Sequence, residues 1–147
     1  MSLKFSTGLR QAILASNPLR QALANSEIRI YSGPEPVSVD SAIAGSNILL
    51  VTIRTDANGG LNFAADAPGG TLLKNLDEIW QGTVVANGVA TFYRHVLPAD
   101  TGVGSTTAPR IQGTVGFAGT DMQLSNTNLV TGAIQKLEAY SVTLPEF

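Results

Sequence analysis

The stretch from Glu78 to Leu97 constrains the fold of this chain more than any other segment. It holds two runs rich in β-branched and aromatic residues, and the dipeptide Asn87-Gly88 separates them. Such residues favour strands, and an Asn-Gly pair between them is typical of a hairpin with a two-residue type I′ turn. The sequence therefore predicts a β-hairpin in which Gly82 lies opposite Tyr93 and leaves room for the Tyr93 ring.

Both faces of this predicted hairpin are apolar. One face carries Trp80, Val84, Val89, Tyr93 and Leu97, and the other carries Ile79, Val85, Phe92 and Val96. A strand pair that is apolar on both sides must be covered on both sides, because an exposed apolar patch is costly in water. We therefore expect either the rest of the domain or a second subunit to pack against each face.

Residues 1–25 form a predicted helical segment. Residues 9–14 read LRQAIL and residues 19–24 read LRQALA, so each copy places its apolar residues on one face of a helix. Two interpretations stay open for this segment. It is either an arm that packs on a neighbouring subunit with Arg10 and Arg20 exposed, or a helix pair that covers one face of its own sheet.

The ends of these two helices have recognisable capping residues. Ser6 or Thr7 can cap the first helix, and Asn17 can cap the second with Pro18 at its first helical position. We expect the two helices to be joined by a kink at Asn17-Pro18.

The body at 27–147 is predicted to be β-rich, and the 147 residues fit a single domain. Seven or eight short strands are expected, the clearest at 27–31, 48–54, 110–117 and 134–144 beside the two of the hairpin. Leu137 is out of phase in the last of these, which predicts a bulge near Glu138. The expected fold is therefore mainly β, a β-sandwich or jelly-roll-like domain or a partly open barrel, with a short N-terminal helical segment.

The composition limits the function. Charged residues make up only 14% of the chain, against about 25% in ordinary soluble domains, so we expect partners to cover part of the surface. The net charge of −2 offers no basic surface for nucleic acid. No apolar run approaches the roughly 20 residues of a membrane span, and the first residues lack the apolar core of a signal peptide. Neither a nucleic-acid partner nor a membrane is expected.

The residues that enzymes use are scarce. The chain has no cysteine and a single histidine, His95, so a Ser-His-Asp triad would depend on that residue. His95 lies among aromatic residues with no nucleophile motif nearby, and we expect a partly buried or interface histidine that could make assembly sensitive to pH. Residues 56–59 resemble the start of a calcium loop, but Ala67 stands where its glutamate should be. We expect no catalytic activity, no cofactor and no metal.

Arginine and aromatic side chains on a surface with little charge are good anchors for a protein interface. The candidate interface residues are Trp80, Tyr93, Arg94, His95, Arg110, Arg10 and Arg20.

Several segments together resemble small virion proteins of tailed bacteriophages and prophages. They are Trp80-x-Gly82, the run 86–94 (ANGVATFYR), Asp100-Thr101-Gly102, the run 109–116 (PRIQGTVG), Gly119-x-Asp121-Met122-x-Leu124-Ser125, the strand 28–33 (IRIYSG) and a Leu-Pro near the C-terminus. The resemblance implies a non-enzymatic structural protein, and capsid decoration or cement proteins of this kind are commonly trimers with β-sandwich or barrel folds.

The expected role is therefore a homotrimeric decoration or cement protein that bridges subunits of the major capsid protein, or of other virion proteins, and stabilises the head. Its location would be the capsid surface of the virion, after a period in the host cytoplasm during assembly. Two alternatives stay open: a tail or head–tail connector protein, and a receptor- or glycan-binding module in which Trp80 and Tyr93 stack on a sugar.

Overall fold

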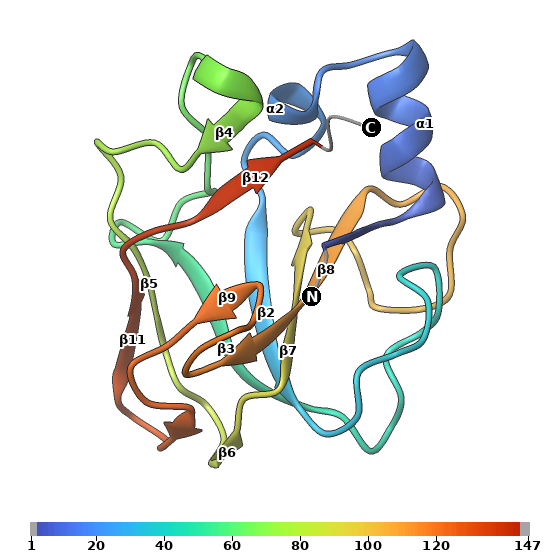
Figure 1. Cartoon of the computed structure of the whole chain (residues 1–147). Helices are drawn as coiled ribbons and strands as arrows, with labels where there is room; N and C mark the ends of the chain where they lie inside the picture. The colour runs from blue at the N-terminus through green and yellow to red at the C-terminus, as the bar shows by residue number, and fades with distance from the viewer. Residues whose placement is uncertain (1–2, 145–147) are drawn as a thin grey trace.

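The computed structural model describes residues 3–144 and shows a mainly β fold with a short N-terminal helical segment (Figure 1). Its sheets remain open, which agrees with a β-sandwich or a partly open barrel, so the predicted fold class is confirmed.

The described residues form two α-helices, one 3₁₀ turn and twelve strands, several of them only two residues long. The bounds are β1 Lys4–Phe5, α1 Thr7–Ala15, α2 Leu19–Ala22, β2 Glu27–Ser32, β3 Ile48–Thr55, η1 Pro68–Gly70, β4 Thr71–Leu73, β5 Trp80–Thr83, β6 Gly88–Val89, β7 Phe92–Val96, β8 Arg110–Gly116, β9 Met122–Gln123, β10 Asn128–Leu129, β11 Ile134–Leu137 and β12 Ser141–Thr143.

The largest sheet runs in the order β1-β8-β7-β2-β3-β5-β11, and β9 adds to β8 beyond the short pairing of β1. All pairings along this path are antiparallel, whereas β9 runs parallel to β8. Two small strand pairs, β6 with β10 and β4 with β12, lie outside it. The large sheet curls, and β9 and β11 form the two sides of its open seam (Figure 1).

The predicted hairpin is wrong. β5 pairs with β3 and β11, β7 pairs with β2 and β8, and neither Asn87 nor Gly88 has the positive φ that a type I′ turn requires. Each strand gains two neighbours within the large sheet, which satisfies more backbone groups than one hairpin partner could. Gly82 is needed for another reason: a Cβ there would lie 2.1 Å from the carbonyl oxygen of Thr52 on β3.

The central strands β2, β7 and β8 have two covered faces. Ile28, Ile30, Tyr93, His95 and Ile111 are buried on the face that packs against the main core. Their neighbours in sequence point the other way, because successive side chains of a strand alternate. That second face, which we call the loop face, lies under the loops at 33–47 and 97–109.

The helical segment packs on its own chain. Ser6 caps α1 by accepting a hydrogen bond from the Leu9 amide, as predicted, and Leu9, Leu19 and Leu23 are buried in the core. The prediction for the second helix is off by one residue: Pro18 is its extended N-cap, and no side chain caps it. Packing on its own body supports the second of the two interpretations given for this segment.

The last predicted strand, 134–144, is interrupted. Residues 138–140 separate β11, which pairs with β5, from β12, which pairs with β4. The irregularity expected near Glu138 is therefore a break between two sheets and not a bulge within one strand. A bulge does occur in β3, where Ile30 pairs with Val51 and Tyr31 pairs with Leu49, so that Leu50 is the additional residue.

We expect Gly82→Ala to lower the free energy of unfolding by about 3 kcal/mol, because the added methyl group meets the backbone of β3. Gly45→Ala is the matched control, since a Cβ there meets nothing within 4 Å, and its effect should stay within about 0.5 kcal/mol. Urea denaturation measures both, and equal effects would contradict the close approach of β5 to β3.

Candidate functional site

Two groups of buried polar side chains and two surface features are the candidates for a functional site. The first group, the arginine cluster, lies on the loop face and consists of Glu27, Arg29, Arg94, Asp100, Arg110 and Gln112. The strand register places Arg29, Arg94 and Gln112 side by side on β2, β7 and β8.

Arg110 is the most completely bonded member of the cluster. Its Nε and Nη2 atoms donate to the two carboxylate oxygens of Asp100 at 2.6 and 2.9 Å. Its guanidinium also donates to the carbonyl oxygens of Val39 at 3.2 Å and Val103 at 2.6 Å. Burial raises the pKa of Asp100, but hydrogen bonds from Arg110 and the Gly102 amide outweigh this and lower it overall. The carboxylate of Asp100 is therefore ionised at neutral pH.

Arg94 connects β7 to the other loop. Its Nε donates to Oε1 of Gln112 at 2.8 Å, and its Nη2 donates to the carbonyl oxygen of Ser41 at 2.7 Å. Burial, together with the nearby charge of Arg110, lowers the pKa of Arg94 to about 10, so it too stays cationic. Arg29 donates to a carboxylate oxygen of Glu27 and to the Asp100 carbonyl, both within 2.8 Å.

These contacts indicate that the arginine cluster holds the structure together. Its donors are directed at backbone carbonyls of the loops 33–47 and 97–109 and at carboxylates of the same chain. The guanidinium groups hold the two loops on the sheet. The buried Nη1 of Arg94 is the one buried cluster nitrogen among the described residues that lacks a hydrogen-bond partner.

The second group surrounds His95, whose side chain is fully buried. Its Nε2 shares a hydrogen bond of 2.5 Å with Oγ of Ser26, and its Nδ1 shares one of 3.1 Å with the Tyr140 hydroxyl. The rings of Phe63, Trp80 and Tyr140 lie around it. Burial lowers the pKa of His95 to about 3, so the imidazole is neutral at physiological pH.

This arrangement resembles a Ser–His pair but does not equip the chain for acyl transfer. Ser26 is 1% exposed and its hydroxyl points at His95 inside the core. In a Ser-His-Asp triad a carboxylate holds the second imidazole nitrogen, whereas here that atom meets the Tyr140 hydroxyl. A substrate carbonyl has no route to the serine oxygen in this arrangement.

Five of the seven candidate interface residues are interior: Trp80, Tyr93, Arg94, His95 and Arg110 are each at most 1% exposed. Their burial in the same chain is contrary to the interface role predicted for them. The reason is that their neighbours lie in this domain: Trp80 donates to Glu78 at 2.9 Å, for example, and Lys74 lies over its ring. Stacking of Trp80 and Tyr93 on a sugar is excluded by the same burial. Arg10 and Arg20 are exposed, and their interface role stays a prediction.

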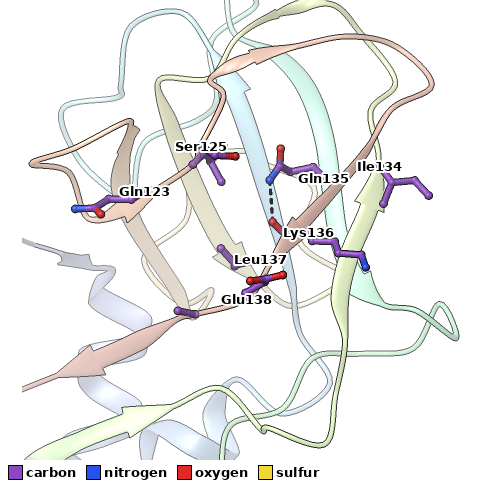
Figure 2. A pocket seen from close by; sticks show the side chains of 9 residues that line it. Gln123, Ser125, Ile134, Gln135, Lys136, Leu137 and Glu138 are labelled. Atoms are coloured by element: carbon purple, nitrogen blue, oxygen red, sulfur yellow. Dashed lines mark hydrogen bonds between the residues drawn. The ribbon is translucent and has the colours of Figure 1, made fainter.

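Sequence reasoning missed two surface features. One is a set of exposed apolar side chains on or beside the neighbouring strands β6, β10 and β11, which we call the apolar end: Val85, Val89, Val130 and Ile134. The other is a groove of about 620 Å³ lined by residues 123–125 and 134–139, between β9 and β11 (Figure 2). The sequence signal that indicates part of the first is the apolar character of both faces of residues 78–97, which include Val85 and Val89.

Two further findings concern the described residues alone. Within 3–144, no three His, Cys, Asp or Glu side chains gather closely enough to hold a metal ion. No helix in that part of the chain is long and apolar enough to cross a membrane.

Comparison with known proteins gives no relative: no protein-family model matches the sequence, and no curated protein and no solved structure is significantly similar to the chain.

We expect Arg110→Ala to lower the free energy of unfolding by about 4 kcal/mol, because Asp100 would remain buried and unpaired. Arg10→Ala, at an exposed arginine, is the matched control and should change it by no more than about 0.5 kcal/mol. In a double-mutant cycle, Arg110→Ala with Asp100→Ala should cost less than the sum of the two single changes. Additivity would show that the pair does not couple.

His95 predicts a dependence of stability on pH. The folded pKa of about 3 lies below the ordinary value of 6.5, so between these values the unfolded chain binds a proton that the folded chain does not. The free energy of unfolding should therefore fall as the pH drops from 6.5 to 4.5, by about 1 kcal/mol per pH unit once His95 of the unfolded chain is mostly protonated. In His95→Gln this slope should disappear. Thermal unfolding at several pH values measures it, and an unchanged slope in the variant would contradict the assignment.

Proposed function

We propose that this protein is a non-enzymatic structural protein of a bacteriophage virion, most plainly a capsid decoration or cement protein. It would act as a homotrimer that bridges subunits of the major capsid protein on the outer surface of the head, after assembly in the host cytoplasm. The resemblance of its turns and aromatic segments to small virion proteins supplies the class of protein. The structural observation that supports it is the apolar end.

The apolar end is exposed, yet the backbone that carries it is held by hydrogen bonds. Val85, Val130 and Ile134 are each about 60% exposed. Backbone hydrogen bonds hold the segments that carry them: the Val84 amide donates to Ala133, and the Gly132 amide donates to Val84, both at 2.9 Å. Exposed apolar side chains on neighbouring, hydrogen-bonded segments are typical of surfaces that bind another protein.

The distribution of charge also supports a surface that other subunits cover. Of an already small number of charged residues, Glu27, Lys74, Arg94 and Arg110 are buried in the chain itself. The remaining surface has still fewer ionised groups to keep a free monomer apart from its neighbours. A protein that covers, and is covered by, other subunits does not need them.

The repeated capsid lattice would strengthen attachment through the apolar ends. When a trimer contacts several capsid subunits at once, weak individual contacts add to firm attachment because the second and third contacts form at high effective concentration. A threefold arrangement also allows apolar ends to be shared between copies. A tail or head–tail connector protein is the second candidate, favoured by the same apolar end but expected in a ring.

We expect Val85→Ser combined with Val130→Ser to abolish trimer formation and binding to phage heads, while the free energy of unfolding of the monomer changes little, because both side chains face solvent in the monomer. The control is Val37→Ser, since Val37 is 94% exposed and belongs to the loop at 33–47, which carries no residue of the apolar end. Light scattering and co-sedimentation with heads measure the two effects. Equal binding of the double variant and the control would contradict the proposed surface.

Copy number separates the two structural roles. Quantitative mass spectrometry of purified virions should find hundreds of copies for a decoration protein and about six to twelve for a connector ring. Absence of the protein from virions would overturn both roles.

A further inference from the structure

We infer that the groove between β9 and β11 is a binding site for an extended segment of another polypeptide, which adds a strand there and closes the open seam of the sheet. This inference concerns a surface that shares only Ile134 with the apolar end, and it does not depend on the function proposed above. The seam is the place where the large sheet stops: β11 pairs only with β5 and β9 pairs only with β8 within the described residues.

The β11 side of the groove presents unpaired backbone groups. The Val84 amide donates to the carbonyl of Ala133, so at this position β11 directs its backbone toward β5. Backbone groups of an antiparallel strand alternate between its two sides. Gln135 and Leu137 therefore face β5, whereas Ile134 and Lys136 direct their N–H and C=O groups into the groove.

A side-chain contact agrees with this alternation. The Gln135 amide nitrogen donates to the carbonyl oxygen of Lys136 at 2.8 Å, so a side chain occupies the position that a neighbouring strand would take (Figure 2). Gln135 is only partly buried, and its side chain can turn away when a backbone donor arrives.

The β9 side is unpaired as well. The Leu124 amide donates to the Gly116 carbonyl of β8 at 2.9 Å. The preceding residue, Gln123, therefore directs its backbone groups away from β8. Gln123 and Ser125 line the groove on this side (Figure 2). The two edges run antiparallel to each other, because β8, β7, β2, β3, β5 and β11 alternate in direction and β9 follows β8. A strand between them would be antiparallel to one edge and parallel to the other.

The volume of the groove indicates how long a bound segment can be, and its lining residues indicate the composition of that segment. With about 4.8 Å between strands, about 10 Å between layers and a rise of about 3.3 Å, one strand residue fills about 160 Å³. The 620 Å³ of the groove therefore accepts about four extended residues. Leu124 and Leu137 are apolar and buried at its base, and the exposed Lys136 and Glu138 carry opposite charges. The best fit is an uncharged segment with apolar residues at alternate positions.

We assign this segment to a different protein. A second copy would need a free extended segment, and the described part of this chain offers none. β1 is paired with β8, and the loops at 33–47 and 97–109 are held by the arginine cluster. A second β11 cannot serve either, since its other edge is already paired with β5 and could not meet β9. The occupant is therefore the extended arm of another polypeptide, bound by strand addition.

The test links a model arm to the chain. The segment Thr-Val-Thr-Val-Thr-Val-Thr is fused after Phe147 through a flexible Gly/Ser linker of about 20 residues, which spans about 25 Å on average and gives a high effective concentration. Amide hydrogen exchange by NMR should then slow by about tenfold or more at Gln123, Ile134 and Lys136. The Gln135 amide, which faces β5, is the internal control and should not change. A fusion with Pro in place of Val is the matched control and should leave all four amides as they were.

A variant tests the backbone directly. Lys136→Pro removes an N–H that points into the groove but no hydrogen bond to β5, so the fold should persist while the slowing at Ile134 and Gln123 is lost. Unchanged exchange at Gln123 and Lys136 in the Val fusion would overturn the inference. Slowing of the same amides in the unfused protein, increasing with its concentration, would place a second copy in the groove and overturn the choice of occupant.

Discussion

The buried ion pair between Arg110 and Asp100 is the interaction on which the rest of the structure depends. Taking two charges out of water is costly, and the cost is offset only when hydrogen bonds satisfy the remaining donors and acceptors. Here both carboxylate oxygens accept from the guanidinium, and two loop carbonyls accept two of its other three hydrogens. Those carbonyls belong to Val39 and Val103, one in each long loop. A single side chain on β8 therefore holds both loops over the sheet, and the loop face is covered without a second layer of strands.

The position of the helical segment follows from that of the loops. The amide and hydroxyl of Thr7 donate to the carboxylate of Asp40 at 2.9 and 2.6 Å, so the loop at 33–47 binds the start of α1. Gly8 lies against the other loop, so closely that a Cβ would meet the Thr107 carbonyl oxygen at 2.3 Å. With its first turn fixed at two points, α1 places Leu9 in the core on the opposite side of the sheet. Charges on one face thus help to position apolar packing on the other.

Sequence reasoning succeeded where local pattern and tertiary environment agree. The alternation of Ile28 and Ile30 with Arg29 and Tyr31 predicted a strand with two different faces, and the structure has both. It failed at Asn87-Gly88, because a turn signal describes what a short segment prefers when it has no other partners. It also failed for Arg94 and Arg110, since arginine is normally a surface residue and no local pattern joins Arg110 to a carboxylate ten positions earlier. The groove could not be predicted, because it depends on which strands stop pairing.

The distribution of polarity departs from that of a typical soluble domain in two respects. Several guanidinium and carboxylate groups are buried and paired inside the chain, while Val85, Val130 and Ile134 face solvent. The apolar end and the seam groove would bind by different physics. Contacts at the apolar end depend on side chains and on excluded water, so they tolerate any partner with a matching apolar surface. Contacts in the groove depend on backbone groups that only an extended chain can satisfy. A protein with both surfaces can bind many apolar partners through the apolar end. Through the groove it binds only a partner that offers an extended segment, so the groove selects the partner's conformation more than its sequence.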